Sequence, residues 1–328
     1  MPTIVDVATA AGVSTATVSR ALSHPDRVSP ETRERVLAAV EGLGYRPNVA
    51  ARTLRTLRAA KLLVTVPDIS NPFFASVIRG AEEAARDAGF GVVLGDTRHD
   101  PEIEDQYGAM LLRREVDGLI FLGHRLPGTL RALAGGEQAP IVNGCDYHAD
   151  LGVPSIHVDN EAAGADAIAH LVALGHRAIG VVTGPEVSPL SRDRLAGATR
   201  LARERGVELR VTPGDYSAQS GFDGATQLIA DGATALFCFS DVMAMGAIEA
   251  VRAAGLSCPG DVSVVGFDDL PLAPFFQPAL TTIAQPKELI GRKAVELLLD
   301  LLRGEAPDAA PAALPHQLVV RRSTAPVR

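Results

Sequence analysis

Apolar side chains recur every three or four residues at the start of the chain, which is the spacing of amphipathic α-helices. A first helix is expected to follow Thr3, because Thr3 with Asp6 three residues later fits a capping box, and to end at Gly12. A second helix is expected to begin after Ser14, with Val18 facing inward. Two short helices joined by a tight glycine turn predict a helix-turn-helix.

A third helix is expected from Ser29-Pro30, a cap followed by proline in the first turn, to Gly44. One face of this helix is expected to carry Val36, Leu37, Val40 and Leu43. The three helices would then share one small core. An ordinary helical bundle is the alternative for the first two helices alone, and the third helix favours the DNA-binding motif.

The second helix leaves short polar and basic side chains for its outer face, namely Thr15, Ala16, Ser19 and Arg20. Hydroxyl, methyl and guanidinium groups of this kind read base edges in the major groove. The helix is therefore predicted to be the one that contacts DNA.

From Lys61 onward, short apolar runs alternate with helical stretches, which predicts an α/β fold with parallel sheets covered on both faces. The strands expected from this pattern are 61–66, 91–94, 117–122, 178–182, 235–239 and 317–320, and 281–286 is a further late segment. The expected helices are 72–88, 101–114, 161–174, 194–205, 221–230, 241–254 and 287–302. Two series of this kind indicate two similar lobes.

The last three segments, 281–286, 287–302 and 317–320, are too short a remainder of the chain to form a third domain. They are therefore expected to cross back and complete both lobes. This gives a DNA-binding headpiece at 1–46, a hinge helix and linker at 47–60, and a core at 61–328. Within the core, the N-terminal lobe is expected at about 61–158 and 284–312. The C-terminal lobe is expected at about 159–283 and 313–328.

Charge is distributed unevenly along the 328 residues. The chain carries a formal net charge of −8, but residues 1–60 hold eight arginines, no lysine and five acids, so the rest of the chain is strongly acidic. Basic charge confined to the headpiece suits contacts with DNA phosphates, and an acidic body discourages indiscriminate binding. Three cysteines without CxxC spacing, no leader-like start and no long apolar run favour a reduced, cytoplasmic protein without a membrane span.

Sequence motifs along nearly the whole chain resemble the lactose-repressor (LacI) family. In the headpiece and hinge these are VSTATVSRAL, VSPETRERV, LGYRPN and AARTL, and in the core they include VPDISNPFF, LGHRAIG, FCFSDVMAMGA and VSVVGFDD. The resemblance implies a periplasmic-binding-protein-like core and a ligand-responsive regulator, expected to be a repressor that binds a pseudo-palindromic operator in double-stranded DNA as a homodimer. The residues expected to bind DNA are Ser14, Thr15, Ala16, Thr17, Ser19, Arg20, Arg27, Asn48, Arg52, Leu54 and Arg55.

In parallel sheets a ligand binds beyond the carboxyl ends of the strands, so the residues after each apolar run are candidates. Many of these have a structural interpretation; Asn160 and Asp241, for example, are expected to cap helices. The residues expected to bind the ligand are Phe73, Phe74, His124, Asp146, Arg194, Tyr216 and Asp268. Among them, Arg194 and Asp268 fall where the family's ligand-contacting arginine and aspartate fall.

A nucleoside is the expected effector. The segment Gly184-Pro185-Glu186, Pro189-Leu190 and Arg194 is most similar to the cytidine-repressor branch of the family, and the aromatic side chains suit a flat base. A sugar-responsive repressor remains an alternative, as do a binding protein without a DNA role and a sugar or nucleoside enzyme. The sequence lacks a phosphate loop, paired histidines at metal-ligand spacing and GxSxG, so neither a cofactor, a metal nor catalysis is expected.

Overall fold

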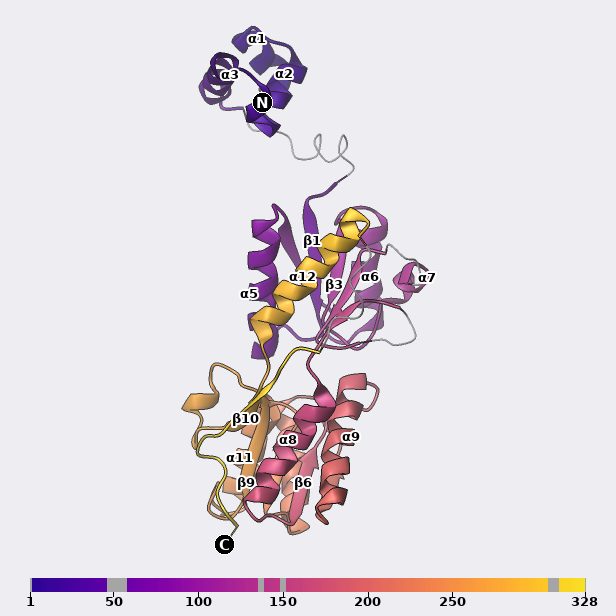
Figure 1. Ribbon diagram of the computed structural model, residues 1–328, viewed down its shortest axis with the longest axis vertical. Helices are drawn as coiled ribbons and strands as arrows, with labels where there is room; N and C mark the ends of the chain where they lie inside the picture. Colours follow the sequence, from indigo (N-terminus) through magenta and orange to yellow (C-terminus); the bar gives the residue numbers. More distant parts are fainter. Residues whose placement is uncertain (1, 46–57, 135–138, 148–151, 306–312, 328) are drawn as a thin grey trace. The chain divides into compact units, whose positions relative to one another are not determined.

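The computed structural model describes residues 2–45, 58–134, 139–147, 152–305 and 313–327. The chain divides into two compact units, Met1–Ala59 and Ala60–Arg328. The first unit contains helices α1 to α3, and the second contains the strands and the remaining helices (Figure 1).

The first unit consists of α1 (Ile4–Ala11), α2 (Thr15–Ser23), a 3-10 turn and α3 (Pro30–Leu43). The hydroxyl of Thr3 accepts from the Asp6 N–H and the Asp6 carboxylate accepts from the Thr3 N–H, so the predicted capping box is confirmed. Gly12 ends α1 in the left-handed conformation at φ 64°, and Ser14 caps α2 through the Thr17 N–H. The predicted helix-turn-helix is therefore present.

Val7, Val18 and Val36 are fully buried at the centre of the headpiece. The prediction that Leu37 and Leu43 share the headpiece core with Val36 was wrong, because the two leucines are 44% and 40% exposed. Leu37 lies about 100° around the helix from Val36, and Leu43 lies in the last turn of α3.

The first lobe of the second unit has a five-stranded parallel sheet in the order β2-β1-β3-β4-β5. Its elements are β1 (Lys61–Val66), α5 (Pro72–Asp87), β2 (Gly91–Asp96), α6 (Pro101–Leu112), β3 (Gly118–Phe121), α7 (Arg131–Ala134), β4 (Ile141–Gly144), β5 (Ser155–Ile156) and α12 (Lys287–Arg303). Helices α5 and α12 lie side by side on one face of the sheet (Figure 1), where Leu62 and Val64 pack. Leu63, which alternates with them, packs on the other face with Leu111 of α6.

The second lobe has a six-stranded sheet in the order β11-β10-β9-β8-β6-β7, in which β11 pairs antiparallel. Its elements are α8 (Asn160–Ala173), β6 (Ala178–Val182), α9 (Pro189–Glu204), β7 (Glu208–Thr212), α10 (Ala218–Ala230), β8 (Ala235–Cys238), α11 (Asp241–Ala253), β9 (Ser263–Asp268), β10 (Thr281–Ala284) and β11 (Gln317–Val319). The chain passes between the lobes after β5, after β10 and after α12.

Glycines allow close contact where neighbouring helices cross. A Cβ atom built on Gly197 of α9 would lie 1.8 Å from the Glu161 carbonyl oxygen, and one on Gly164 of α8 would lie 2.1 Å from the Arg194 carbonyl oxygen. Equivalent reciprocal pairs occur where α5 crosses α12 and where α10 crosses α11: Gly80 with Gly291, and Gly221 with Gly246. The two helices of each pair therefore touch backbone to backbone.

Several boundaries differ from the sequence-based expectation. Helix α9 begins five residues earlier than expected, at Pro189, and β2 extends two residues further, to Asp96. Strands β4, β5, β7 and β9 were not assigned individually from the apolar pattern. Asn160 and Asp241 were expected to cap α8 and α11, but each lies one residue inside the helix and is buried in its first turn. The side chains that cap these helices are those of Asp159 and Ser240.

Candidate functional site

Helix α2 presents the side chains expected to read DNA. Thr15, Ala16 and Arg20 are exposed, while Val18 between them is fully buried and fixes which face looks outward. Ser14 is exposed at the start of the helix, and its hydroxyl lies 2.9 Å from that of Thr17. Ser19 and Thr17 are half-buried, and Arg27 is exposed just after the helix. The hinge residues Asn48, Arg52, Leu54 and Arg55 lie outside the described residues.

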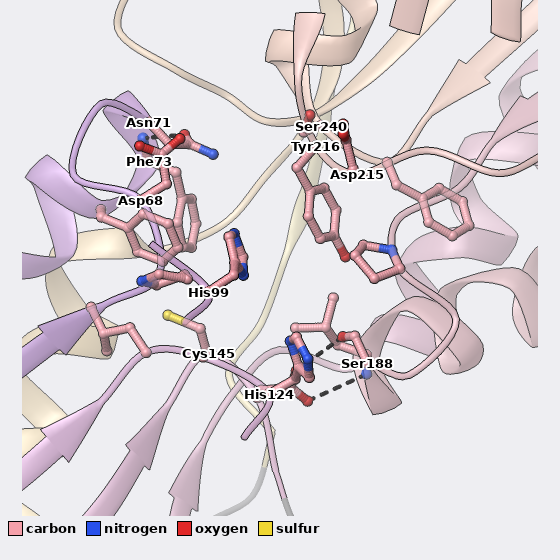
Figure 2. A pocket seen from close by; sticks show the side chains of 18 of the residues that line it. Asp68, Asn71, Phe73, His99, His124, Cys145, Ser188, Asp215, Tyr216 and Ser240 are labelled. Atoms are coloured by element: carbon pink, nitrogen blue, oxygen red, sulfur yellow. Dashed lines mark hydrogen bonds between the residues drawn. The ribbon is translucent and has the colours of Figure 1, made fainter. Parts of the chain in front are cut away.

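A cavity of about 410 Å³ lies between the two lobes of the second unit, at the carboxyl ends of their strands. This is where parallel sheets place ligands, and its volume is that of a small-molecule site. The structure brings all seven residues expected to bind the ligand to this cavity: Phe73, Phe74, His124, Asp146, Arg194, Tyr216 and Asp268. Figure 2 shows side chains of both lobes pointing into it.

Arg194 of α9 is 2% exposed and tightly held. Its Nε and Nη2 donate to Oδ1 of Asn160 at 3.3 and 2.7 Å, and its Nη1 donates to the carbonyl of Phe239 at 2.6 Å. The guanidinium also lies over the ring of Phe267, 3.3 Å from the centroid. A guanidinium has five N–H donors, so two remain for a ligand in a fork of fixed orientation.

Asp268 ends β9 next to the cavity with a left-handed backbone, at φ 115°. Its Oδ1 accepts from Gln285 at 2.8 Å, and the ammonium of Lys287 donates to the backbone carbonyls of Asp268 and Asp269. Burial raises the pKa of the Asp268 carboxyl to about 6, although Arg194, Gln285 and Lys287 oppose this. At neutral pH the group is therefore mainly an acceptor for ligand hydroxyls.

Asp146, just after β4, faces the cavity and bonds to the other lobe. Its Oδ2 accepts from the Ser188 hydroxyl at 3.0 Å, and its Oδ1 accepts from the Tyr147 and Leu190 N–H groups. Burial raises the pKa of Asp146 to about 6, and these hydrogen bonds lower it by a smaller amount. Both oxygens of Asp146 therefore already have partners within the chain.

Aromatic rings form part of the cavity wall. Phe73 and Phe74 meet edge to face with their centroids 5.2 Å apart, and they belong to the core of the first lobe as well as to the wall. Tyr216 has φ 70°, and its ring lies so close to Gly184 that a Cβ there would be 2.2 Å from the hydroxyl. Flat faces on both lobes suit a planar ligand.

The imidazole of His124 lies near that of His99, with centroids 6.4 Å apart and planes at 28°. His99 and Arg98 line the cavity from consecutive left-handed positions, at φ 57° and 52°. They were missed because the strand before them was expected to end at Leu94, so no strand-end residues were sought after Asp96. Other lining residues that were not singled out include Cys145, Phe239 and Gln285.

Comparison with known proteins identifies the family. Residues 3–48 match the model for bacterial regulatory proteins of the lacI family, and residues 168–324 match the periplasmic binding protein-like domain. The HTH-type transcriptional repressor CytR of Escherichia coli (strain K12) is 39% identical over 327 residues, covering 98% of this chain and 96% of that repressor. The chain belongs to the LacI family.

Solved structures of LacI-family proteins have the same fold. The lac repressor dimer bound to operator and the anti-inducer ONPF superposes with a TM-score of 0.88 at 32% identity, covering 99% of each chain. A LacI family regulator from Enterococcus faecium with bound ribose gives a TM-score of 0.74 at 28% identity, covering 82% of this chain and 100% of that one. This LacI-family chain is therefore a ligand-responsive, DNA-binding transcriptional regulator, and its curated relatives are regulators and not enzymes.

Two further observations concern the described part of this LacI-family chain. No helix there is both long and apolar enough to span a membrane. Nor do three or more His, Cys, Asp or Glu side chains meet there in a group that could hold a metal ion.

Proposed function

We propose that the protein is a cytoplasmic repressor without enzymatic activity that binds a pseudo-palindromic operator as a homodimer and is controlled by a nucleoside. The observation that carries this proposal is the presence, in one chain, of an exposed helix suited to reading DNA and of a cavity lined by both Arg194 and Asp268. A ligand that binds one arrangement of the lobes more tightly shifts the population toward that arrangement, and operator affinity changes by no more than this preference.

The dimer is supported by the size of the reading helix. Helix α2 has nine residues and can reach the bases of only one half-site. Two headpieces related by two-fold symmetry read twice as many base pairs, which gives the selectivity a repressor needs. The similarity to the lac repressor dimer bound to operator, over 99% of both chains, supports the same assembly.

The nucleoside is supported by the two kinds of surface in the cavity. The two remaining donors of Arg194 and the carboxylate of Asp268 suit the neighbouring hydroxyls of a ribose. The rings of Phe73, Phe74 and Tyr216 suit a flat base, and His124 or Asp146 would lie at its edge. The regulator with bound ribose in the same fold is consistent with a ribose-containing ligand. A hexose would use the same arginine and aspartate, so sugar control is the second candidate.

The DNA-reading role predicts that Arg20→Ala weakens binding to the operator by about 1 to 3 kcal/mol, with little effect on random DNA. The protein's own promoter region is the first operator to test, by gel shift and fluorescence titration. Arg35→Ala is the matched control, because Arg35 is an exposed arginine on α3, outside the helix predicted to read DNA. Equal losses on operator and random DNA would show that Arg20 contacts phosphates only.

The effector is tested by calorimetric titration with cytidine, uridine, adenosine, ribose and a panel of hexoses. We expect at least one nucleoside to bind more tightly than every sugar and to change operator affinity in the gel shift. Tighter binding of a hexose than of every nucleoside would replace the nucleoside by a sugar and leave the repressor function intact. Binding without any change in operator affinity would favour a binding protein, and turnover of a nucleoside would favour an enzyme.

A further inference from the structure

Two consecutive residues of the first lobe reach across to the start of α9 in the second lobe. Asp146 accepts from Ser188 Oγ at 3.0 Å and from the Leu190 N–H at 3.4 Å. Tyr147 donates its hydroxyl to Oδ2 of Asp193 at 2.9 Å. These bonds are made by the chain's own residues, so they join the two lobes without a ligand.

Tyr147 also touches the segment that joins the lobes. Its ring lies 5.2 Å from that of His157, and His157 follows β5 just before α8. Tyr147 therefore contacts both a joining segment and α9. Neither Tyr147 nor Asp193 lines the cavity, whereas Asp146 and Arg194, their neighbours in the chain, both do.

We propose that Asp146 and Tyr147 form a clasp on the first turns of α9, and that the Tyr147–Asp193 bond regulates the site by setting how readily the lobes separate. Tyr147 and Asp193 are positioning residues, because they act on the ligand through Asp146 and Arg194. The link to ligand binding rests on the proposed function, while the effect on lobe separation does not.

The amide of Leu190 reports the clasp directly. Leu190 is the second residue of α9, where backbone N–H groups have no acceptor within the helix. Its acceptor is Asp146 of the other lobe, so its hydrogen can exchange with solvent once the lobes separate. Tyr147 and Asp193 are both half-buried, so their bond is assigned the net strength of an ordinary hydrogen bond, and its loss is expected to raise the open population about three- to tenfold.

The test compares amide hydrogen exchange of full-length wild type and Tyr147→Phe, which keeps the ring against His157 and removes the hydroxyl. Leu190 is expected to exchange about three to ten times faster in the variant, while Val64 in β1 is unchanged. Tyr107→Phe is the matched control, because Tyr107 packs within the first lobe against Gly95. Unchanged exchange at Leu190, or equal acceleration at Leu190 and Val64, would overturn the clasp.

A double-mutant comparison shows whether Tyr147 acts on lobe separation through its hydrogen bond to Asp193. Asp193→Ala should accelerate Leu190 exchange about as much as Tyr147→Phe, and combining the two should add nothing further. Fully additive effects would mean that the Tyr147–Asp193 bond does not hold the lobes, and the proposal would fall.

The link to ligand binding is tested by titrating both proteins with cytidine, uridine and adenosine. A nucleoside that binds wild type is expected to bind Tyr147→Phe more weakly, by at most the same three- to tenfold factor, because the variant loses closed population and not a cavity contact. Equal affinities together with faster exchange would contradict the regulatory role. If no nucleoside binds wild type, the proposed effector fails, and the exchange experiment still decides whether the clasp exists.

Discussion

Arg194→Ala is expected to abolish ligand binding and to lower the free energy of unfolding by about 3 kcal/mol. The substitution leaves the Asn160 side-chain oxygen and the Phe239 carbonyl without their donors, inside a region where Arg194 is 2% exposed. It also removes the positive charge that lowers the pKa of Asp268, so this carboxyl becomes harder to ionise. Urea unfolding and calorimetry measure the two effects.

Two other substitutions show whether the effects of Arg194→Ala come from the lost charge, from the lost planar guanidinium, or from removing any arginine of α9. Arg194→Lys keeps the charge but has no planar fork, so we expect its ligand affinity to stay far below that of wild type. Arg203→Ala removes an exposed arginine near the end of the same helix and should change neither property. Ligand binding by Arg194→Ala at wild-type affinity would show that the guanidinium is structural only.

Gly197→Ala is expected to lower the free energy of unfolding by about 3 kcal/mol, the upper part of the range for overpacked positions. The new Cβ would lie 1.8 Å from the backbone oxygen of Glu161, which cannot move as a flexible side-chain end can. Helices α8 and α9 must separate, and Arg194 moves with α9 away from its bonds to Asn160. Ligand affinity should therefore fall together with stability.

Gly42→Ala is the control for the glycine substitution. Gly42 lies near the end of α3, and a Cβ there would meet nothing within 4 Å. Alanine is the better helix former, so this variant should be at least as stable as wild type. A stable Gly197→Ala protein with normal ligand binding would mean that the two helices can shift apart without consequence.

Features encoded within a few neighbouring residues could be predicted from the sequence. The Thr3–Asp6 capping box, the Gly12 turn and the inward-facing Val18 each depend on positions no more than four apart, and all three are present. The alternation of strands and helices could also be predicted from the sequence, because buried parallel strands appear there as continuous apolar runs. Searching after strand ends led to seven residues that line one cavity.

Features that depend on distant residues could not be predicted in the same way. The Tyr147–Asp193 bond joins residues 46 positions apart, and no local spacing indicates it. Arg98 and His99 were missed because Gly95 interrupts the apolar run of β2, although the strand continues to Asp96. Leu37 is apolar and yet exposed, because hydropathy alone does not say how wide the buried stripe of a short helix is.

The glycine contacts between helices also determine how the second lobe responds to force. A side chain between two helices can change rotamer and absorb a small displacement, but at Gly164 the α8 backbone rests against the carbonyl of Arg194 itself. A displacement of Arg194 toward α8 is therefore expected to push the α8 backbone directly. We therefore expect α8 and α9 to move as one rigid unit, and the segments that join the lobes to bend.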